Sequence, residues 1–296
     1  MEQKKIAVLI PCYNEEKTIV KVIRELRKVL PEASIYVYDN NSTDHSYELV
    51  QKEKCFLRKE FRQGKGYVVQ SMFREIEADC YLMIDGDHTY SVKQARKMCE
   101  LVLEEKVDMV VGDRLSGGYF EENKRLFHNF GNKLICFLIN ILFSGDVGDV
   151  LSGYRAFSRE FVKNFPILSK KFEIETEMTI FAIHHHFKIS TIPVLYKDRI
   201  DGSYSKLSTY RDGFRILIMT KKLFKRYKPE VYYKFLSILF FIISLVFYFF
   251  RLNIVMFLIF FIISIFLFLV VSFFEIFSVY DNQLFWICLQ NMRRRK

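Results

Sequence analysis

Two carboxylates that could take part in chemistry, those of Asp85 and Asp87, flank Gly86 directly after the apolar run 81–84, in the segment "YLMIDGDHTYS". Two negative charges this close repel each other unless a cation lies between them. On one turn both can face a single divalent cation, and oxygen-only ligands favour a hard ion such as Mg²⁺ or Mn²⁺. A hard ion held by few protein groups usually also binds substrate phosphates. A plain acidic hairpin turn is the alternative interpretation of the Asp-Gly pair.

The elements that must position this pair alternate between strands and helices. Apolar runs typical of buried strands occur at about 4–12, 34–39, 55–60, 80–85 and 107–114, separated by segments with helical spacing. Such alternation predicts an α/β fold with a mainly parallel sheet and helices on both faces. Polar residues follow four of these strands, at 11–15, 38–44, 85–89 and 112–114. Because ligands bind beyond the carboxyl ends of parallel strands, the carboxylate pair is expected in a binding site.

The last quarter of the chain has a different composition. Between residues 235 and 274 the one charged residue is Arg251, in a region otherwise rich in Phe, Ile, Leu and Val. Two apolar runs, at about 232–250 and 254–274, have the length of about 20 residues that a bilayer core requires. We therefore expect a membrane anchor over 229–296 with two transmembrane helices in a hairpin, behind a domain over 1–228. The mildly amphipathic segment 275–292 is expected along the membrane interface.

The distribution of charge supports a membrane partner and argues against nucleic acid. The net charge is +10, and nine of the cations lie in "KKLFKRYK" (221–228) and "RRRK" (293–296), which flank the apolar block. Cationic clusters in these places fit anionic lipid headgroups, and the positive-inside tendency puts the 1–228 domain and both termini in the cytosol. The segment 206–228 is expected as a basic amphipathic helix lying on the membrane surface.

Several motifs together resemble a known family. The segments "IPCYNEEKTI", "VYDNNSTD", "GKGYVV", "MIDGDHTY", "VVGDR", "DVLSGYRAFSR" and "RIDGSYSKLSTYRDG" occur in the order seen in family-two glycosyltransferases with the GT-A fold. More narrowly, the chain resembles the polyprenyl-phosphate glycosyltransferases, of which dolichol-phosphate mannose synthase is the best-known type. The resemblance covers about residues 4 to 228. It implies a nucleotide-sugar donor, a dolichyl or undecaprenyl phosphate acceptor, a Mg²⁺ or Mn²⁺ cofactor and an inverting transfer of one hexose.

The resemblance also implies roles for individual residues. It assigns binding of the nucleotide-sugar to Pro11, Tyr13, Glu15, Asp39, Gly64, Lys65, Asp85, Gly86 and Ser205. It assigns the metal to Asp85 and Asp87, and the reacting phosphates and sugar to Asp87, Arg114, Asp149, Arg199 and Lys206. It places Arg155 on the sugar side. The segment "FEIETEM" (172–178) carries glutamates at alternate positions, so Glu175 or Glu177 could orient the sugar or contact the acceptor side, although an acidic first helical turn would equally explain them.

The sequence departs from the mannose type in two places. Thr89 stands where mannose synthases carry a glutamine, and it is a poorer metal ligand. A second acceptor-side arginine expected around 128–131 is missing, since "HNFG" stands there. The segments "DNNSTD" and "FEIETE" also look less like the mannose type, so UDP-glucose or a UDP-N-acetylhexosamine is the preferred donor and GDP-mannose the alternative.

Two other functions compete with transfer to a lipid phosphate. A transferase that extends a glycan at a sugar hydroxyl would need a catalytic carboxylate for deprotonation. Its processive members usually carry a QxxRW-like segment, whereas the single tryptophan, Trp286, lies beyond the apolar runs. A membrane scaffold that binds a nucleotide-sugar without turnover is the second alternative, and the intact Asp85–Asp87 pair argues against it.

Overall fold

The computed structural model describes residues 4–116, 126–197, 199 and 209–294. The chain divides into two compact units, Met1–Met219 and Thr220–Lys296, so the division falls within helix α9 (Thr209–Tyr227).

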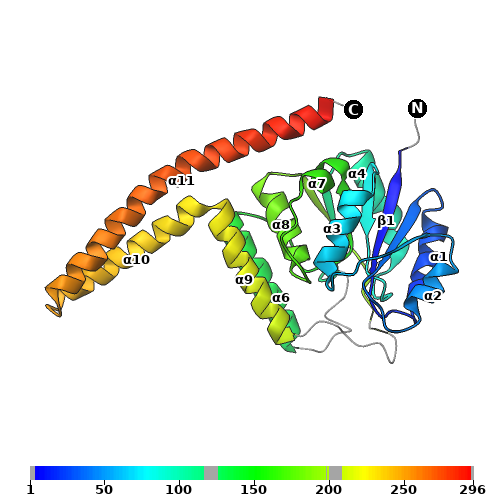
Figure 1. Cartoon of the computed structure of the whole chain (residues 1–296), viewed down its shortest axis with the longest axis horizontal. Coiled ribbons are helices and arrows are strands. Elements are labelled where there is room, and N and C mark those ends of the chain that lie inside the picture. The colour runs from blue at the N-terminus through cyan, green and yellow to red at the C-terminus, as the bar shows by residue number, and fades with distance from the viewer. Residues whose placement is uncertain (1–3, 117–125, 198, 200–208, 295–296) are drawn as a thin grey trace. The chain divides into compact units, whose positions relative to one another are not determined.

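The described part of the first unit is built around a seven-stranded sheet with the order β3-β2-β1-β4-β6-β5-β7 (Figure 1). Strand β6 is antiparallel to both of its neighbours, and the remaining strand pairs are parallel. The strands are β1 (Ile6–Cys12), β2 (Ser34–Asp39), β3 (Phe56–Lys59), β4 (Cys80–Met83), β5 (Met109–Asp113), β6 (Arg155–Ser158) and β7 (Ile189–Pro193). The predicted mainly parallel sheet is confirmed, and the carboxyl ends of β1, β2, β4 and β5 meet at one edge.

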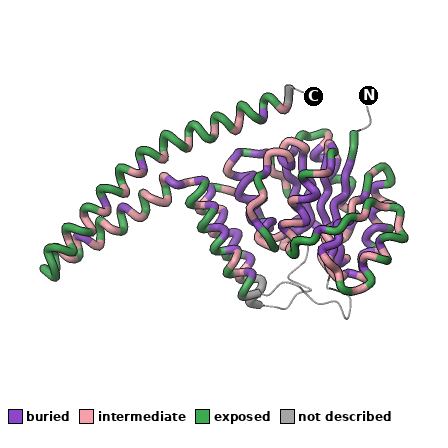
Figure 2. The backbone as a smooth tube through the Cα atoms, viewed as in Figure 1, coloured by how far each residue is buried: buried purple, intermediate pink, exposed green. Residues whose placement is uncertain are grey.

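Helices cover both faces of this sheet because successive strand residues point to opposite sides. On one face Leu82 and Ala156 join an aliphatic core with α1 and α4, while on the other Tyr81 and Phe157 meet the aromatic ring of Phe73 from α3. The helices of this unit are α1 (Ile19–Val29), α2 (Ser46–Gln51), α3 (Lys65–Glu75), η1 (Val92–Gln94), α4 (Ala95–Leu103), α6 (Leu126–Phe143), α7 (Arg159–Asn164), α8 (Ile174–His184) and the first part of α9. Figure 2 shows the strands as the buried centre of the unit.

The second unit contains a pair of long helices, α10 (Pro229–Phe249) and α11 (Ile254–Arg294). The Ser237 hydroxyl donates to the Ser264 carbonyl at 2.9 Å, and the Ser264 hydroxyl donates back to the Ser237 carbonyl at 3.1 Å. Both helices are long and apolar enough to cross a membrane, and most of their residues are exposed (Figure 2). Helix α11 continues without a break past residue 274, where the sequence analysis ended the second span.

Candidate functional site

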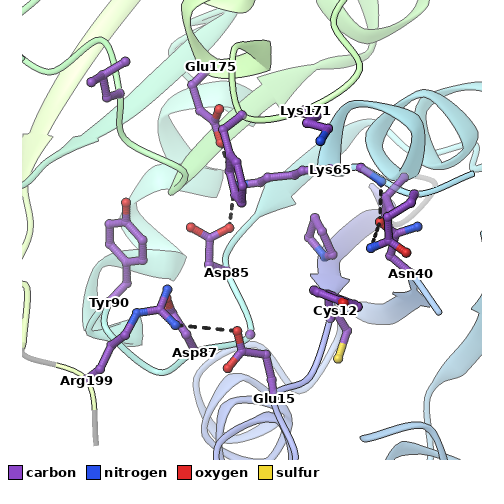
Figure 3. Close-up of a pocket in the computed structure, with 18 of the residues that line it drawn as sticks. Cys12, Glu15, Asn40, Lys65, Asp85, Asp87, Tyr90, Lys171, Glu175 and Arg199 are labelled. Atoms are coloured by element: carbon purple, nitrogen blue, oxygen red, sulfur yellow. Dashed lines mark hydrogen bonds and ion pairs between the residues drawn. The ribbon is translucent and has the colours of Figure 1, made fainter. Parts of the chain in front are cut away.

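A pocket of about 330 Å³ lies at the carboxyl edge of the sheet (Figure 3). It is formed by the segments that follow β1 and β4, together with parts of the loops before α3 and α8. Of the residues expected to act, the structure brings the following into its lining: Pro11, Tyr13, Glu15, Gly64, Lys65, Asp85, Gly86, Asp87, Arg114, Glu175 and Arg199.

Each carboxylate of the acidic pair has its own cation from the protein. The Lys65 ammonium lies 2.5 Å from Asp85 Oδ1 and 2.6 Å from Glu175 Oε1. The Arg199 guanidinium lies 2.5 Å from Asp87 Oδ2 and 3.8 Å from Glu15 Oε1. Figure 3 shows Lys65 pointing toward Asp85 and Glu175, and Arg199 lying beside Asp87 and Glu15. The repulsion expected between the two aspartates is therefore offset by separate ion pairs.

Burial and ion pairing shift the titration of this cluster. Burial opposes a charge on Lys65, but the carboxylates of Asp85 and Glu175 outweigh it and raise the pKa of Lys65 above its ordinary value. The pKa of Glu175 is raised, chiefly because its carboxyl group is buried, although Lys65 acts in the opposite direction. Lys65 therefore stays charged and holds the two carboxylates around it.

The turn that carries the aspartates is anchored to helix α1. The Thr18 hydroxyl donates to the Gly86 carbonyl at 2.8 Å, and His88 Nε2 lies 3.0 Å from Glu25 Oε2. His88 has a positive φ of 59°, a left-handed conformation that the tight turn requires. These contacts fix the backbone from which Asp85 and Asp87 project.

Asn40, which the sequence analysis did not single out, holds the Lys65 loop. Its Oδ1 accepts a hydrogen bond from Gly64 N at 2.7 Å, and its Nδ2 donates to the Glu60 and Arg62 carbonyls, both at 2.9 Å. Gly64 has φ 140°, and a Cβ there would lie 2.2 Å from the Lys170 carbonyl oxygen. The polar residues that follow β2 indicated a binding site there, but the family resemblance points to Asp39 in that segment, for the base and ribose, and not to Asn40.

Gly153 is a second residue that the sequence analysis missed. A Cβ at this position would lie 2.3 Å from Asp85 Oδ2 and 3.0 Å from Lys65 Nζ. The Gly153 N–H donates to the Tyr90 hydroxyl at 2.9 Å, and Tyr90 also lines the pocket. The glycine in "LSGYR" was part of the motif that suggested the family, although its contact with Asp85 could not be read from spacing.

Arg114 is held by a buried carboxylate at the pocket wall. Its Nε and Nη2 lie 2.7 and 2.9 Å from the two oxygens of Asp149, which is fully buried. The Tyr196 ring lies 5.4 Å from the guanidinium carbon. Burial disfavours the Asp149 carboxylate, but Arg114 outweighs this effect and lowers the pKa of Asp149 below its usual value.

Other predicted residues do not line the pocket. Asp39 is buried at the end of β2, where Oδ2 accepts from Ser42 N and Oδ1 is unpaired among the described residues. Arg155 is fully buried and donates to the carbonyls of residues 150 and 152 and to the Thr179 hydroxyl, and burial lowers its pKa to about 10. Glu177 accepts hydrogen bonds from the backbone of residues 168 and 169. Ser205 and Lys206 lie outside the described residues.

The acidic pair provides a suitable donor set for a divalent cation. Asp85 and Asp87 line one pocket and each already attracts a cationic side chain, so the local field favours positive charge. The described residues contain no group of three or more His, Cys, Asp or Glu side chains arranged for a metal. A hard ion such as Mg²⁺ or Mn²⁺ commonly takes only one or two protein carboxylates and completes its shell with water and substrate phosphates, and the two aspartates fit that pattern.

The fold and the pocket define a class of protein. The mostly parallel sheet with a carboxylate pair at its ligand-binding edge is a GT-A fold, the architecture of nucleotide-sugar transferases. The chain belongs to glycosyl transferase family 2, whose family model matches residues 7–165.

Curated and solved relatives agree with this assignment. Glycosyltransferase AglJ of Haloferax volcanii is 34% identical over 229 residues, which are 77% of this chain and 75% of the relative. The UDP-N-acetylglucosamine–dolichyl-phosphate N-acetylglucosaminyltransferase of Methanococcus voltae is 24% identical over 66% of this chain and 86% of its own. The fold is similar to that of glucosyl-3-phosphoglycerate synthase from Mycobacterium tuberculosis, solved with Mn²⁺, UDP and glucosyl-3-phosphoglycerate. The TM-score is 0.57 at 20% identity, over 73% of this chain and 80% of that chain.

Proposed function

We propose that this glycosyltransferase moves one hexose or N-acetylhexosamine from a nucleotide-sugar to a polyprenyl phosphate at a membrane surface. One observation carries the choice of acceptor. The carboxylates that line the described pocket are Glu15, Asp85, Asp87 and Glu175, and each pairs with Lys65 or Arg199. A carboxylate held by a cation is poorly placed to take a proton from a hydroxyl, and this includes Glu175, whose pKa is raised but which Lys65 holds at 2.6 Å. An acceptor that is already an anion therefore suits this site better than a sugar hydroxyl.

A phosphate monoester meets this requirement because its second pKa is about 6, so it is largely dianionic at neutral pH. The reaction is then a displacement in which an acceptor oxygen bonds to the anomeric carbon while the bond from that carbon to the donor diphosphate breaks. The electron pair of the broken bond stays with the nucleotide diphosphate. A single displacement inverts the configuration, so an α-linked donor gives a β-linked lipid phosphate sugar.

The donor diphosphate and the acceptor phosphate are both anions, so positive charge is needed to bring them together. Asp85 and Asp87 would hold a Mg²⁺ or Mn²⁺ ion, which supplies neutralisation of the charge on the leaving diphosphate. Arg199 lies at the same carboxylates and would move onto the donor phosphates together with Lys206. Arg114, held against Asp149 at the pocket wall, would face the acceptor phosphate. Asp39, whose Oδ1 is buried and unpaired among the described residues, would accept from the base or ribose of the donor.

The apolar hairpin supports a lipid acceptor. Helices α10 and α11 have the length and composition of membrane-spanning helices, and a polyprenyl phosphate carries its phosphate at the bilayer surface. An enzyme anchored in the bilayer meets such an acceptor by diffusion in two dimensions. The Methanococcus voltae relative is named for transfer from UDP-N-acetylglucosamine to dolichyl phosphate, which favours a UDP-sugar donor here, with GDP-mannose as the alternative.

A donor panel tests this proposal. The full chain in detergent is given a short polyprenyl phosphate, Mn²⁺ or Mg²⁺, and each labelled UDP-sugar or GDP-mannose in turn. We expect one donor to transfer label into the organic phase, and we expect EDTA or Asp87→Ala to abolish the transfer. The Asp87→Ala protein must unfold like the wild type for this comparison to hold.

Each alternative predicts a different result. Transfer to a glycan hydroxyl and none to lipid phosphate would overturn the proposed acceptor. A base would then be sought first at Glu175, which lines the pocket, and not at Asp149 or Glu177, which do not. Binding of a nucleotide-sugar without transfer to any acceptor would favour the scaffold function.

A further inference from the structure

The two oxygens of Asp87 have different surroundings, and Thr89 accounts for the difference. Both the N–H and the hydroxyl of Thr89 donate to Asp87 Oδ1, at 3.1 and 2.6 Å. Asp87 Oδ2 instead lies against Arg199. One oxygen is therefore satisfied by the turn itself, and the other is directed toward positive charge.

Thr89 is also connected to the segment that carries Arg199. Its carbonyl accepts a hydrogen bond from Lys197 N at 2.8 Å, and Ser91 N donates to the Leu195 carbonyl at 3.1 Å. Tyr90 and Tyr196 form an antiparallel bridge between these two pairs. Residues 89–91 and 195–197 thus run side by side, and Arg199 follows two residues later.

We propose that Thr89 is a positioning residue that leaves Oδ2 as the only Asp87 oxygen able to bind a divalent cation. This inference rests on the proposed function, because it concerns the cation that the acidic pair would hold. Thr89 is 1% exposed and does not line the described pocket, so it acts through Asp87 and is not itself a ligand.

The hydrogen bonds from Thr89 limit the freedom of the Asp87 carboxylate. Two hydrogen bonds to one oxygen stop Asp87 from rotating or binding a metal through both oxygens. Residues that orient a metal-binding carboxylate from outside typically contribute about 10–100-fold to metal affinity. Removing the hydroxyl while keeping the shape should therefore weaken binding of the metal and should not abolish it.

Titration of Mn²⁺ into the full chain in detergent, with UDP present and binding followed by electron paramagnetic resonance, tests this role. We expect Thr89→Val to raise the Mn²⁺ dissociation constant about 10–100-fold and Thr89→Ser, which keeps the hydroxyl, to stay close to the wild type. Thr191→Val, on the exposed edge of β7, is the matched control and should bind Mn²⁺ like the wild type.

A second measurement separates positioning from ligation. In EDTA, the Thr89→Val substitution should lower the unfolding temperature more when it is made in the wild-type protein than when it is made in the Asp87→Ala protein. In the Asp87→Ala protein the carboxylate that accepts from the Thr89 hydroxyl is already absent. A direct ligand would show no such coupling without metal. Three results would each overturn the role of Thr89 while leaving the proposed function intact. They are a Thr89→Val protein that binds Mn²⁺ with wild-type affinity, a Thr89→Ser protein that loses as much Mn²⁺ affinity as Thr89→Val, and changes in unfolding temperature that add up in the double variant. Failure of the wild type to bind Mn²⁺ would overturn the proposed metal as well.

Discussion

At the scale of single residues, the site is a set of matched charges. Lys65 and Arg199 neutralise the carboxylates where the donor diphosphate and its metal are proposed to bind, and Asp149 neutralises Arg114. A buried charge that loses its partner is strongly destabilising, whereas the intact pair contributes little net stability. The pairs therefore make the fold sensitive to single substitutions in the site.

The Arg114–Asp149 pair yields a prediction about stability and pH. Asp149→Asn removes the fully buried counter-charge of the half-buried Arg114 and should cost unfolding free energy at neutral pH, at the lower end of about 3–5 kcal/mol. Because the folded-state pKa of Asp149 lies below its usual value of 3.8, the stabilisation is present above that value and is lost as the pH falls through the folded pKa. The deficit of the variant should therefore shrink in acid. Urea unfolding of the wild type and of Asp149→Asn in detergent, measured once at neutral pH and once in acid, checks this.

The double variant Arg114→Met/Asp149→Leu serves as the control, since it removes both charges and should be more stable than the single variant. Unfolding of Asp149→Asn with the wild-type midpoint at neutral pH would contradict the argument.

At the scale of elements, loops that are distant in sequence close around the end of β4. The loop before β6 places Gly153 against Asp85, and the loop before α8 lies so close to the Lys65 loop that a Cβ on Gly66 would meet the Ser169 carbonyl oxygen at 2.2 Å. The sheet edge therefore supplies the carboxylates, and the surrounding loops determine how those side chains point.

The contact at Gly153 yields a prediction about activity. In Gly153→Ala the added methyl group would occupy the space of Asp85 Oδ2, so the carboxylate must turn away from Lys65. A misplacement of about 1 Å at a reacting centre can cost about 100-fold in rate, and we expect a loss of that order in kcat/KM for the donor. The melting temperature should fall only modestly, because Lys65 keeps its ion pair with Glu175 when Asp85 turns away.

Gly131→Ala is the matched control for this change, because a Cβ at Gly131 would meet nothing within 4 Å. Steady-state kinetics of both variants with the donor identified by the panel make the comparison. Equal activity of Gly153→Ala and Gly131→Ala would show that the close approach does not matter for catalysis.

At the scale of the whole molecule, the proposed arrangement is a cytosolic catalytic unit on a membrane hairpin. Cations before α10 and at the end of α11, with Arg251 alone between the apolar runs, favour both ends on the cytosolic side. A single cysteine introduced as Leu252→Cys should then react with an impermeant maleimide from the opposite side of the membrane. Cys288, kept as the only cysteine in a matched protein, should react from the cytosolic side.

Labelling of right-side-out and inverted vesicles measures both positions. Reaction of Leu252→Cys and Cys288 from the same side would show that the helices do not form a spanning hairpin.

The sequence by itself determined the features that are written in local patterns. The alternation of apolar runs and helical spacing predicted the parallel sheet. The polar residues after 84 predicted the acidic edge, and the apolar blocks after 231 predicted the helical hairpin. These features depend on periodicity and composition within short windows, so no tertiary information was needed. Strand β6, which is short and antiparallel, lacked such a pattern and was not predicted.

Only the tertiary structure decided which side chains meet. Lys65 bridges Asp85 and Glu175, Gly153 abuts Asp85, and Arg199 pairs with Asp87, whereas Arg155 and Glu177 support the backbone away from the pocket. Partners that lie far apart in the sequence are brought together by the packing of separate loops. The distances between these partners depend on how the whole chain folds, and the residue types and local spacing that indicated the site do not contain that information.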